Sequence, residues 1–505
     1  MSDESVRAAL RSDARLVVIE APAGCGKTYQ GSHYARDTLS TLAVGRPLIL
    51  THTHAACSVF AEGTRGSSRV DIRTIDSVIG NLGGAYHAGL GLPADVAGWI
   101  RQRADGYGEL ADKVDKLLHR HPMIAAALAR RHPIVVCDEH QDSSVHQHAI
   151  VMSLLDQGAR LRIFADPMQR IFRNKGAATG NAAWDWEEVK RSADAVEELD
   201  YPHRWNQGCK DLGDWTLAAR TVLKSGGVID LRGRLPASIT ILCAENRAQR
   251  NLEFQLSSSD RRAIDAFEKM QTSLLILTAH NLTARSLRSF FFRRIPLWEG
   301  HVRRGLENLV SAINAAGDGR AALAAGVVTF LADVGKGFSP SEFGDRFEQE
   351  VSEGCCKPCK GKPATIQALA RFIVAEPNHH GVSQMLRRLH ELRNGDPAFS
   401  KVEIDCHREF WDAVRLGEFD SMDTGLAEIT HRRTYLRPKP PLRAISNIHK
   451  AKGLECDSVI LMPCDRKTFP DNPETRCLLY VALSRAMKRL MLVVSRDNPS
   501  PLFKF

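Results

Sequence analysis

Short runs of apolar residues recur in the first half of the chain and are separated by longer stretches with helical periodicity. Four of these runs predict strands, at residues 16–19, 47–50, 134–137 and 161–164. Short apolar strands that alternate with helical stretches are typical of a parallel sheet with crossover helices. Residues 79–128, between the second and third strands, have the pattern of helices and loops. The pattern therefore predicts an α/β domain that contains a mainly helical insertion.

The same alternation begins again in the second half of the chain. Residues 273–278 predict a strand, and an apolar and basic helix is expected over residues 284–294. Two more strands are predicted at residues 458–461 and 490–494. Residues 300–435, which lie between the strand at 273–278 and the strand at 458–461, have apolar residues three and four positions apart, as in helices. The clearest of these positions are Val382, Leu386, Leu389 and Leu392. A second α/β unit, also interrupted by helices, is therefore expected.

Composition narrows the class of protein. The chain has 505 residues, enough for three or four domains of ~150 residues each. Its 43% apolar and 25% charged residues are typical of globular proteins and exclude a collagen or a wholly disordered chain. No apolar stretch approaches the ~18 residues of a membrane span, and the opening MSDESVRAAL lacks the pattern of a secretory signal. The 12 cysteines are therefore expected to be reduced thiols in a cytoplasmic protein.

The charge balance is basic, with 68 lysines and arginines against 59 aspartates and glutamates and a net charge of +9. Such a surplus suits an anionic partner such as nucleic acid. A mildly basic cytosolic enzyme has the same balance, so charge alone leaves both alternatives open.

The segment APAGCGKT, residues 21–28, lies between the first predicted strand and a predicted helix. This is the context of a phosphate-binding loop, in which glycines let backbone N–H groups approach a phosphate at a helix N-terminus. Lys27 is expected to reach the β- and γ-phosphates, and the Thr28 hydroxyl to bind Mg²⁺. The candidate contacts with the nucleotide are Ala23, Gly24, Cys25, Gly26, Lys27 and Thr28. The segment predicts ATP and Mg²⁺ as cofactors.

Two carboxylates follow the third predicted strand. Asp138 is expected to bind Mg²⁺, and Glu139 to act as the base that activates water. An Asp-Glu pair at a strand end is by itself more often a solvated turn. Together with the loop at residues 21–28, it predicts the acidic half of a nucleotide-hydrolysing site.

Seven segments place these motifs in a wider order that covers nearly the whole chain. In sequence and order they resemble the motifs of superfamily 1A DNA helicases of the UvrD/Rep/PcrA type. The segments are ILTHTHAAC (49–57), RTIDS (73–77), DEHQD (138–142), DPMQRIF (166–172), LDYPHRW (199–205), IHKAKGLE (448–455) and LYVALSRA (479–486).

The resemblance implies a fold of two RecA-like P-loop domains, called 1A and 2A, each with a parallel sheet. Both domains are expected to be interrupted by mainly helical insertions, called 1B-like and 2B-like. The expected limits are 1–78 and 129–230 for domain 1A, 79–128 for the 1B-like insertion, 231–299 and 437–505 for domain 2A, and 300–436 for a reduced 2B-like insertion.

The resemblance also implies roles for single residues at the nucleotide. Gln169 corresponds to a glutamine that contacts the γ-phosphate and links hydrolysis to movement. Arg204 and Arg485 correspond to two arginine fingers, whose charge offsets the negative charge of the transferring phosphoryl group. Glu455 corresponds to a residue that contacts the ribose.

The base-binding positions depart from the family pattern. The family has a glutamine upstream of the phosphate-binding loop that contacts adenine, but no glutamine precedes Gln30 here. His203 stands where the family has a tyrosine that stacks on the base. ATP is therefore inferred from the resemblance, and selectivity for the base is open.

The positions implied to face DNA also depart from the family. Family members stack bases on aromatic side chains, but His52 replaces a phenylalanine and Asn174 a tryptophan, while Phe172 replaces a tyrosine. Trp184 and Trp186 follow closely and are interpreted as buried core residues. Affinity for DNA is therefore expected to depend mainly on basic residues. The candidate DNA contacts are His52, Thr53, Phe172, Asn174, Lys175 and His449.

Two clusters contain potential metal ligands. Cys356 and Cys359 have the spacing of half a zinc site, but no second pair follows, so structural zinc and free thiols in a loop are both open. His146 and His148 are two positions apart on a predicted helix, which does not place them on one face. They are interpreted as ordinary polar residues.

Two functions are consistent with these motifs. The first is an ATP-dependent helicase or translocase on single-stranded DNA, which the resemblance implies moves 3′ to 5′. The second is a DNA- or nucleotide-responsive ATPase subunit that regulates a partner nuclease in anti-phage defence without processive unwinding. The small size of the chain resembles the helicase-like subunit of Gabija defence systems, which works beside an OLD-family nuclease.

Overall fold

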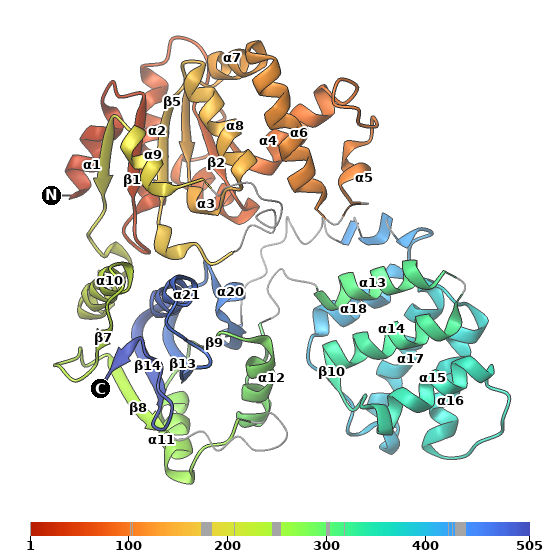
Figure 1. The fold of residues 1–505 in the computed structure, drawn as a ribbon. Coiled ribbons are helices and arrows are strands. Elements are labelled where there is room, and N and C mark those ends of the chain that lie inside the picture. Colours follow the sequence, from red (N-terminus) through yellow and green to blue (C-terminus); the bar gives the residue numbers. More distant parts are fainter. Residues whose placement is uncertain are drawn as a thin grey trace. The chain divides into compact units, whose positions relative to one another are not determined.

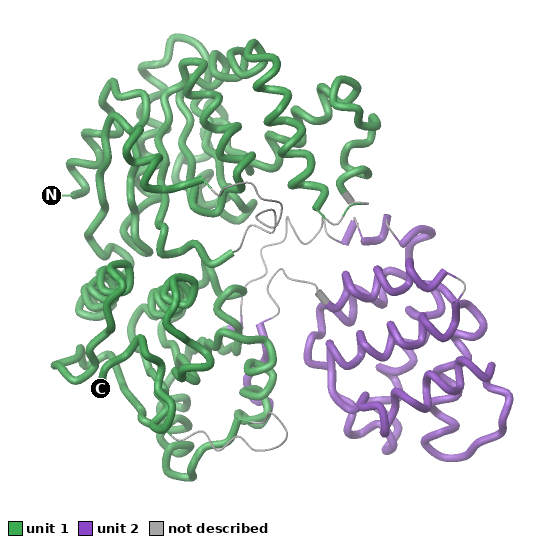
Figure 2. The backbone as a smooth tube through the Cα atoms, viewed as in Figure 1, with its two compact units in different colours: residues 1–292, 442–505 green, residues 293–441 purple. Residues whose placement is uncertain are grey.

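The chain forms two compact units, residues 1–292 with 442–505 and residues 293–441 (Figure 2). The computed structural model describes residues 2–101, 103, 105–172, 184–206, 208–244, 254–298, 304–317, 319–422, 424–426, 428–429 and 441–505. None of the helices in these ranges is long and apolar enough to span a membrane.

The first RecA-like domain is built on a six-stranded parallel sheet with the strand order β3-β2-β4-β5-β1-β6. Strands β1, β2 and β5 of this sheet are labelled in Figure 1. The four strands predicted from apolar runs are confirmed and form the centre of this sheet. The edge strands β3 and β6 were not predicted, because their sequences DIRT and AVEE are polar and only half buried. The strands are β1 (Leu16–Glu20), β2 (Leu48–Thr51), β3 (Asp71–Thr74), β4 (Ile134–Cys137), β5 (Arg160–Ala165) and β6 (Ala195–Glu198).

Helices cover both faces of this sheet because successive strand residues point to opposite sides. Val17 and Ile19 of β1 belong to one buried cluster, whereas Leu16 and Val18 belong to another. Helices α4 to α7 lie between β3 and β4 along the chain and form the helical insertion. The helices are α1 (Ser2–Arg11), α2 (Lys27–Asp37), α3 (His54–Gly63), α4 (Ile75–Ala85), α5 (Val96–Arg101), α6 (Gly106–Arg120), α7 (Pro122–Arg131), α8 (Val145–Asp156), α9 (Trp186–Ser192) and α10 (Lys210–Lys224).

The second RecA-like domain has a five-stranded parallel sheet with the order β12-β9-β13-β14-β8. The three predicted strands are confirmed as β9, β13 and β14, and the two edge strands were not predicted. Its strands are β8 (Ile239–Ala244), β9 (Leu274–Thr278), β12 (Arg443–Asn447), β13 (Cys456–Cys464) and β14 (Ala486–Ser495), and a short pair joins β7 (Ile229–Asp230) to β15 (Phe503–Lys504). Its helices are α11 (Ser258–Lys269), α12 (Asn281–Phe290), α20 (Ile448–Ala451) and α21 (Pro473–Leu483).

The expected helix over residues 284–294 is wrong at its C-terminal end. Helix α12 ends at Phe290, and Phe292 and Arg293 have φ values of 48° and 57°. Such left-handed backbone cannot continue a right-handed helix. These two residues also mark the boundary between the two compact units.

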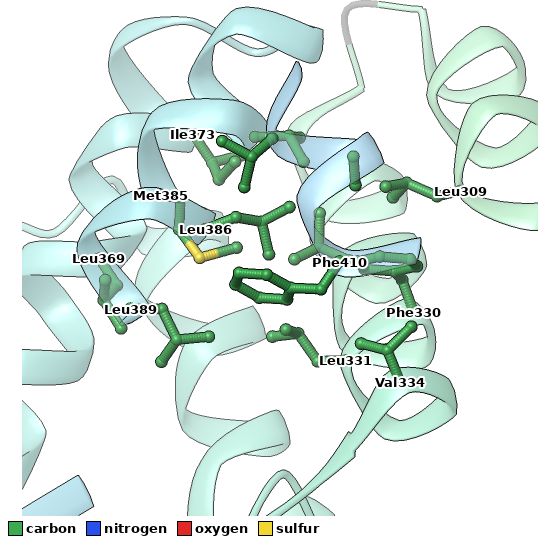
Figure 3. Packing of buried hydrophobic residues seen from close by; sticks show 14 of the residues in the cluster. Leu309, Phe330, Leu331, Val334, Leu369, Ile373, Met385, Leu386, Leu389 and Phe410 are labelled. Carbon is green, nitrogen blue, oxygen red and sulfur yellow. The ribbon is translucent and has the colours of Figure 1, made fainter. Parts of the chain in front are cut away.

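The second unit, residues 293–441, is mainly helical and has its own apolar core. Figure 3 shows Phe410 packed among Leu331, Met385, Leu386 and Leu389. The helical periodicity that includes Leu386 and Leu389 is confirmed, since both are fully buried on α17. The elements are α13 (Arg304–Ala316), α14 (Arg320–Val334), a π-helix (Pro340–Gly344), α15 (Asp345–Glu353), α16 (Lys362–Ala375), α17 (His379–Gly395), α18 (His407–Leu416) and the paired strands β10 (Gly335–Lys336) and β11 (Glu403–Ile404).

Candidate functional site

The loop between β1 and α2 has the backbone that phosphate binding requires. Gly24 and Gly26 have φ values of 76° and 90°, and Gly26 caps the N-terminus of α2. A Cβ atom on Gly24 would lie 2.7 Å from Cβ of Arg204 and 2.8 Å from the ring of Trp205, so only glycine fits there. The first N–H groups of α2 have no partners within the helix and are suited to an anion.

Tyr480 connects this loop to the second RecA-like domain. Its hydroxyl accepts a hydrogen bond of 2.8 Å from the backbone N–H of Ala23. Cys25, also in the loop, is fully buried, and burial raises the pKa of its thiol to about 12. Cys25 is therefore a neutral packing residue. The hydroxyl of Tyr480 was not singled out from the sequence, although the residue lies within the segment LYVALSRA.

Lys27 and Glu139 form an ion pair beside the loop. Burial alone would lower the pKa of Lys27 and raise that of Glu139, but their mutual attraction outweighs burial and shifts both pKa values the other way. Glu139 has left-handed backbone, with φ 53° and ψ 37°, which is strained for a residue other than glycine. The side chain of Gln141 donates to Glu139 and accepts from the backbone N–H of Asp166 at 3.1 Å. The candidate base is thus held from two sides.

Asp138 and Thr28 are the candidate Mg²⁺ ligands. The Oδ1 atom of Asp138 is buried, and no donor within the described part of the chain hydrogen-bonds to it. Burial and the charge of Glu139 raise the pKa of Asp138. A buried, unpartnered carboxylate oxygen and a hydroxyl at a helix start are the hard oxygen ligands that Mg²⁺ prefers, so these residues fit the ion. A bound Mg²⁺ would supply positive charge to the phosphates and to Asp138.

Gln169 is buried next to the loop after β5. Its amide donates to Asp166 at 2.9 Å, and Asp166 accepts two further bonds from Arg220, at 3.0 and 3.1 Å. Arg220 also pairs with Glu20 at 2.5 Å. This charge network, buried between β1, β5 and α10, holds Gln169 in place. Arg220 lies in none of the motifs, so the sequence had no signal for it.

The two candidate arginine fingers have different surroundings. Arg204 pairs with Glu455 at 2.5 Å and donates to the carbonyl of Ser484 at 2.9 Å. Arg485 is buried and donates to the carbonyl of Val481 at 3.0 Å, to the carbonyl of Leu454 at 3.2 Å and to the hydroxyl of Ser484 at 2.8 Å. Burial and the charge of Arg204 lower the pKa of Arg485 to about 10. The structure therefore brings Arg204 and Glu455 together. Arg485 lies next to this pair, because it donates to Leu454, which precedes Glu455, and to Ser484, which also binds Arg204.

The ring of His203 lies beside Gly26, at the N-terminus of α2. Its ring Cδ2 atom is 3.3 Å from the position of a Cβ atom on Gly26, and its Nε2 atom is 2.7 Å from Asp3. Asp3 also accepts from the amide of Gln30 at 3.1 Å. A carboxylate on α1 thus holds the residue expected to stack on the base. The base contacts of all these residues stay predictions.

Lys452 joins the two RecA-like domains at a third place. Its ammonium group donates to both oxygens of Asp142, at 2.6 and 2.8 Å, and to the carbonyl of Gln169 at 2.9 Å. The same ammonium lies 5.2 Å above the ring centre of Phe172, which is 49% exposed. The ring of Phe172 is also 6.1 Å from the ring of His449. Two candidate DNA contacts therefore adjoin the backbone of Gln169.

The other candidate DNA contacts are less uniform. The ring of His52 bonds to the hydroxyl of Ser143 at 3.2 Å, and Thr53 caps α3 by accepting from the N–H of Ala56. Asn174 and Lys175 lie outside the described residues.

The two tryptophans near this region are not stacking surfaces for bases. Trp184 and Trp186 are only 9% and 7% exposed, which confirms that they are core residues. The indole of Trp184 donates to the carbonyl of Ser143 at 2.8 Å. The aromatic surface next to Lys452 is therefore that of Phe172.

The two clusters of potential metal ligands have different outcomes. Cys356 and Cys359 are free thiols, and no group of three or more His, Cys, Asp or Glu residues in the described ranges could hold a metal ion. The interpretation of His146 and His148 as ordinary polar residues stays a prediction, although His148 has contacts beyond its own helix. Its Nδ1 atom is 2.9 Å from Nε2 of His140, and its ring stacks on Trp184 with 4.7 Å between ring centres.

Two family matches coincide with this geometry. The sequence matches the UvrD/REP helicase N-terminal domain over residues 97–186 and the UvrD-like helicase C-terminal domain over residues 443–493. The first match includes Asp138, Glu139 and Gln169, and the second includes Lys452 and Arg485. Family proteins of this kind are helicases that use ATP and act on DNA. Over these two segments the chain is therefore similar to helicases of the UvrD/Rep type.

Proposed function

We propose that this protein is a motor that couples ATP hydrolysis to 3′-to-5′ movement along single-stranded DNA. The observation that carries the proposal is the triple contact of Lys452 with Asp142 and with the carbonyl of Gln169. This contact joins the segment after Glu139, the segment that carries Gln169 and the surface of Phe172. A change on the DNA side can therefore reach the nucleotide side through one ammonium group. The direction of movement is the one that the family resemblance implies.

The proposed hydrolysis divides the work among the residues of the cleft. Lys27 leaves its pair with Glu139 to bind phosphate, which frees the Glu139 carboxylate to accept a proton from the attacking water. Asp138 and Thr28 would hold Mg²⁺, which would neutralise charge on the phosphates. Arg204 and Arg485 add positive charge where the transferring phosphoryl group becomes more negative.

Coupling is proposed to run through Gln169. Its side chain is fixed by Asp166, and its carbonyl is fixed by Lys452. When DNA binds next to Phe172 and His449, the ammonium of Lys452 changes its surroundings on the exposed side. Because the same group holds Gln169, the orientation of the Gln169 amide toward the γ-phosphate follows.

The test measures ATP turnover with and without single-stranded DNA, and the release of streptavidin from strands biotinylated at either end. The wild-type protein is expected to hydrolyse ATP faster with DNA and to displace streptavidin only from the 5′ end. Lys452→Ala is expected to lower DNA-stimulated kcat about 10-fold or more, within the range of typical coupling energies.

Lys488→Ala is the matched control, because Lys488 forms an exposed pair with Asp457 on the same domain. It is expected to change neither measurement. DNA-independent turnover in the wild type, or full stimulation in Lys452→Ala, contradicts the proposal.

The alternative function, an ATPase subunit that regulates a partner nuclease, is favoured by one observation. His52 is hydrogen-bonded to Ser143, and Trp184 and Trp186 are buried, so these three rings do not form a stacking surface. Weak stacking suits a DNA-responsive switch better than a processive motor. Strand displacement by the purified chain supports the motor. Strand displacement that occurs only after an OLD-family nuclease is added supports the alternative. A change in the activity of that nuclease when this protein is added also supports the alternative.

A further inference from the structure

A chain of four side chains connects the end of β2 to the turn after β4. Nε2 of His52 is 3.2 Å from Oγ of Ser143, which is 3.3 Å from Nδ1 of His140. Nε2 of His140 is 2.9 Å from Nδ1 of His148 on α8. The strands β2 and β4 are parallel neighbours, so the segments that follow them emerge side by side at one edge of the sheet.

The two middle residues of this hydrogen-bonded chain of side chains are buried. Ser143 is 0% exposed and His140 is 1% exposed. Trp184 closes the site, because its ring stacks on His148 and its N–H donates to the carbonyl of Ser143. Burial lowers the pKa of His52 and His148, which favours the neutral form of both rings, and the 2.9 Å contact between the ring nitrogens of His140 and His148 requires one of the two nitrogens to be unprotonated.

A neutral imidazole donates through one ring nitrogen and accepts through the other. The chain therefore has two consistent arrangements of its protons. In the first, His52 donates to Ser143, Ser143 to His140 and His140 to His148, which leaves Nδ1 of His52 as an acceptor. In the second, every donor becomes an acceptor, and Nδ1 of His52 carries a proton. Each imidazole keeps one proton in both arrangements, so the chain stays neutral.

The outer end of this hydrogen-bonded chain is Nδ1 of His52. Nδ1 of His52 has no hydrogen-bond partner in the described ranges of the chain. An acceptor at this atom, such as a phosphate oxygen or a base carbonyl of a nucleic acid, favours the second arrangement. A donor at this atom favours the first.

The inner part of the chain adjoins the candidate base. His140 directly follows Glu139, and a single turn of 3-10 helix, His140–Asp142, begins at this residue. The N–H of Ser143 donates to the carbonyl of His140 at 3.0 Å, and the N–H of Asp142 donates to the carbonyl of Glu139 at 2.9 Å. The strained backbone of Glu139 is thus followed directly by the turn that contains His140 and Ser143, and such strain persists only where the surrounding structure holds it.

We propose that His52, Ser143, His140 and His148 form a positioning relay in which a DNA acceptor bound at His52 sets the direction of the hydrogen-bond chain and thereby the orientation of Glu139. None of the four residues takes part in the chemistry, so they are positioning residues. The inference rests on the proposed stimulation of hydrolysis by DNA and adds to it a second route of coupling, separate from Lys452.

The kinetic test removes the central link. Ser143→Ala deletes one hydroxyl and keeps the packing, so it is expected to retain basal hydrolysis within about two-fold and to lose about 10-fold of the DNA stimulation of kcat. KM for ATP is expected to stay unchanged. Ser143→Thr restores the hydroxyl and is expected to recover stimulation. Full stimulation in Ser143→Ala overturns the relay.

His146→Ala is the control on the same helix. His146 contacts Asp115 at 2.9 Å and is not part of the chain. It is expected to keep wild-type stimulation, and a loss there equal to that of Ser143→Ala would overturn the assignment to the relay. His148→Leu breaks the far end of the chain and is expected to lose stimulation in the same way.

A second measurement observes the relay directly. Nitrogen-15 NMR of the full chain with labelled histidine distinguishes the two protonated forms of a neutral ring. Saturation with a single-stranded oligothymidylate is expected to move the proton of His140 to Nδ1, with Ser143→Ala as the variant in which it does not move. A His140 ring that stays the same with bound oligonucleotide overturns the relay even if hydrolysis responds to DNA. Wild-type hydrolysis that does not respond to DNA overturns the proposed function instead.

Discussion

Arg204 and Glu455 form an ion pair with 2.5 Å between their side chains, and the pair joins the two RecA-like domains. Arg204 follows the first sheet, directly after the loop that contacts Gly24, whereas Glu455 precedes β13 of the second sheet. The pair therefore lies beside the candidate phosphate-binding loop, with one residue from each domain. Any nucleotide that takes Arg204 for its phosphates must compete with Glu455.

Glu139→Gln is expected to abolish turnover and keep nucleotide binding. The amide preserves the shape of the side chain but cannot accept the proton from water, and loss of a general base typically lowers kcat by about 100-fold or more. Binding is expected to be equal or tighter, because Lys27 is released from its ion pair. Single-turnover hydrolysis and equilibrium titration with a fluorescent nucleotide measure the two effects. The exposed Glu188→Gln on α9 is the control, and near-normal hydrolysis in Glu139→Gln would remove Glu139 from the role of base.

Arg204→Ala and Arg485→Ala are expected to differ in stability. Both should lower kcat more than they raise KM, because positive charge matters most in the transition state. Arg485→Ala should also lower the free energy of unfolding by about 2 kcal/mol or more, because it removes three hydrogen bonds of a buried guanidinium, to the carbonyls of Val481 and Leu454 and to the hydroxyl of Ser484. Steady-state kinetics with urea unfolding separate the effects. An increase in KM alone would show that the arginine is a ground-state contact.

Single-strand binding is expected to be weak and strongly dependent on salt. For each phosphate contact, the logarithm of the association constant falls by ~0.7 per log unit of salt concentration, whereas stacking responds little to salt. Lys175→Ala should reduce the salt slope by about one such contact. Asn174→Trp, which introduces the residue of the family, should tighten binding and flatten its relative loss at high salt. Titrations across salt concentrations measure both, and tight, salt-insensitive binding by the wild type is the contrary result.

Phe172→Ala is expected to weaken single-strand binding without changing the salt slope. The exposed ring beside Lys452 is the proposed stacking surface, and one stacked base contributes ~1–3 kcal/mol. That range corresponds to a loss of about 5- to 150-fold in affinity. Phe172→Tyr should bind like the wild type. A changed salt slope in Phe172→Ala would mean that the ring orders basic side chains and does not itself stack on a base.

Acidification below pH 6.5 is expected to destabilise the protein through His148. Burial lowers the pKa of its imidazole from 6.5 to about 4, so between these values the unfolded chain binds a proton that the folded chain does not. Stability then falls as the pH falls, by at most about 1.4 kcal/mol per pH unit for one such group. His148→Gln should reduce the slope between pH 6.5 and 5, whereas the exposed His121→Gln should not. Urea unfolding at several pH values measures this, and equal slopes in all three proteins would refute it.

The centres of both sheets and the phosphate-binding loop could be predicted from the sequence. Strands such as β1 and β9 are buried on both faces and therefore apolar throughout, which makes them visible as short runs. Edge strands such as β6 have one neighbour, and half of their residues face solvent. Their sequences resemble loops, so periodicity does not detect them.

The contacts within the site were less predictable, because they join segments far apart in the chain. Nothing local to Tyr480 indicates that its hydroxyl binds the N–H of Ala23. His148 was judged by its neighbours on one helix, whereas its partners are His140 in the preceding turn and Trp184. Local periodicity describes one element at a time and carries no information on which elements meet.

The order of strands in the second sheet has a consequence for synthesis on the ribosome. Among the residues that the structure describes, strand β9 pairs with β12 and β13, and β8 pairs with β14 alone. All three partners follow the second compact unit, residues 293–441. At roughly 5–20 residues per second, the nascent chain holds both early strands unpaired for on the order of ten to thirty seconds. During that time the apolar strand Leu274–Thr278 is a site for chaperone binding or aggregation, and any product that stops before β14 leaves β8 without its neighbour.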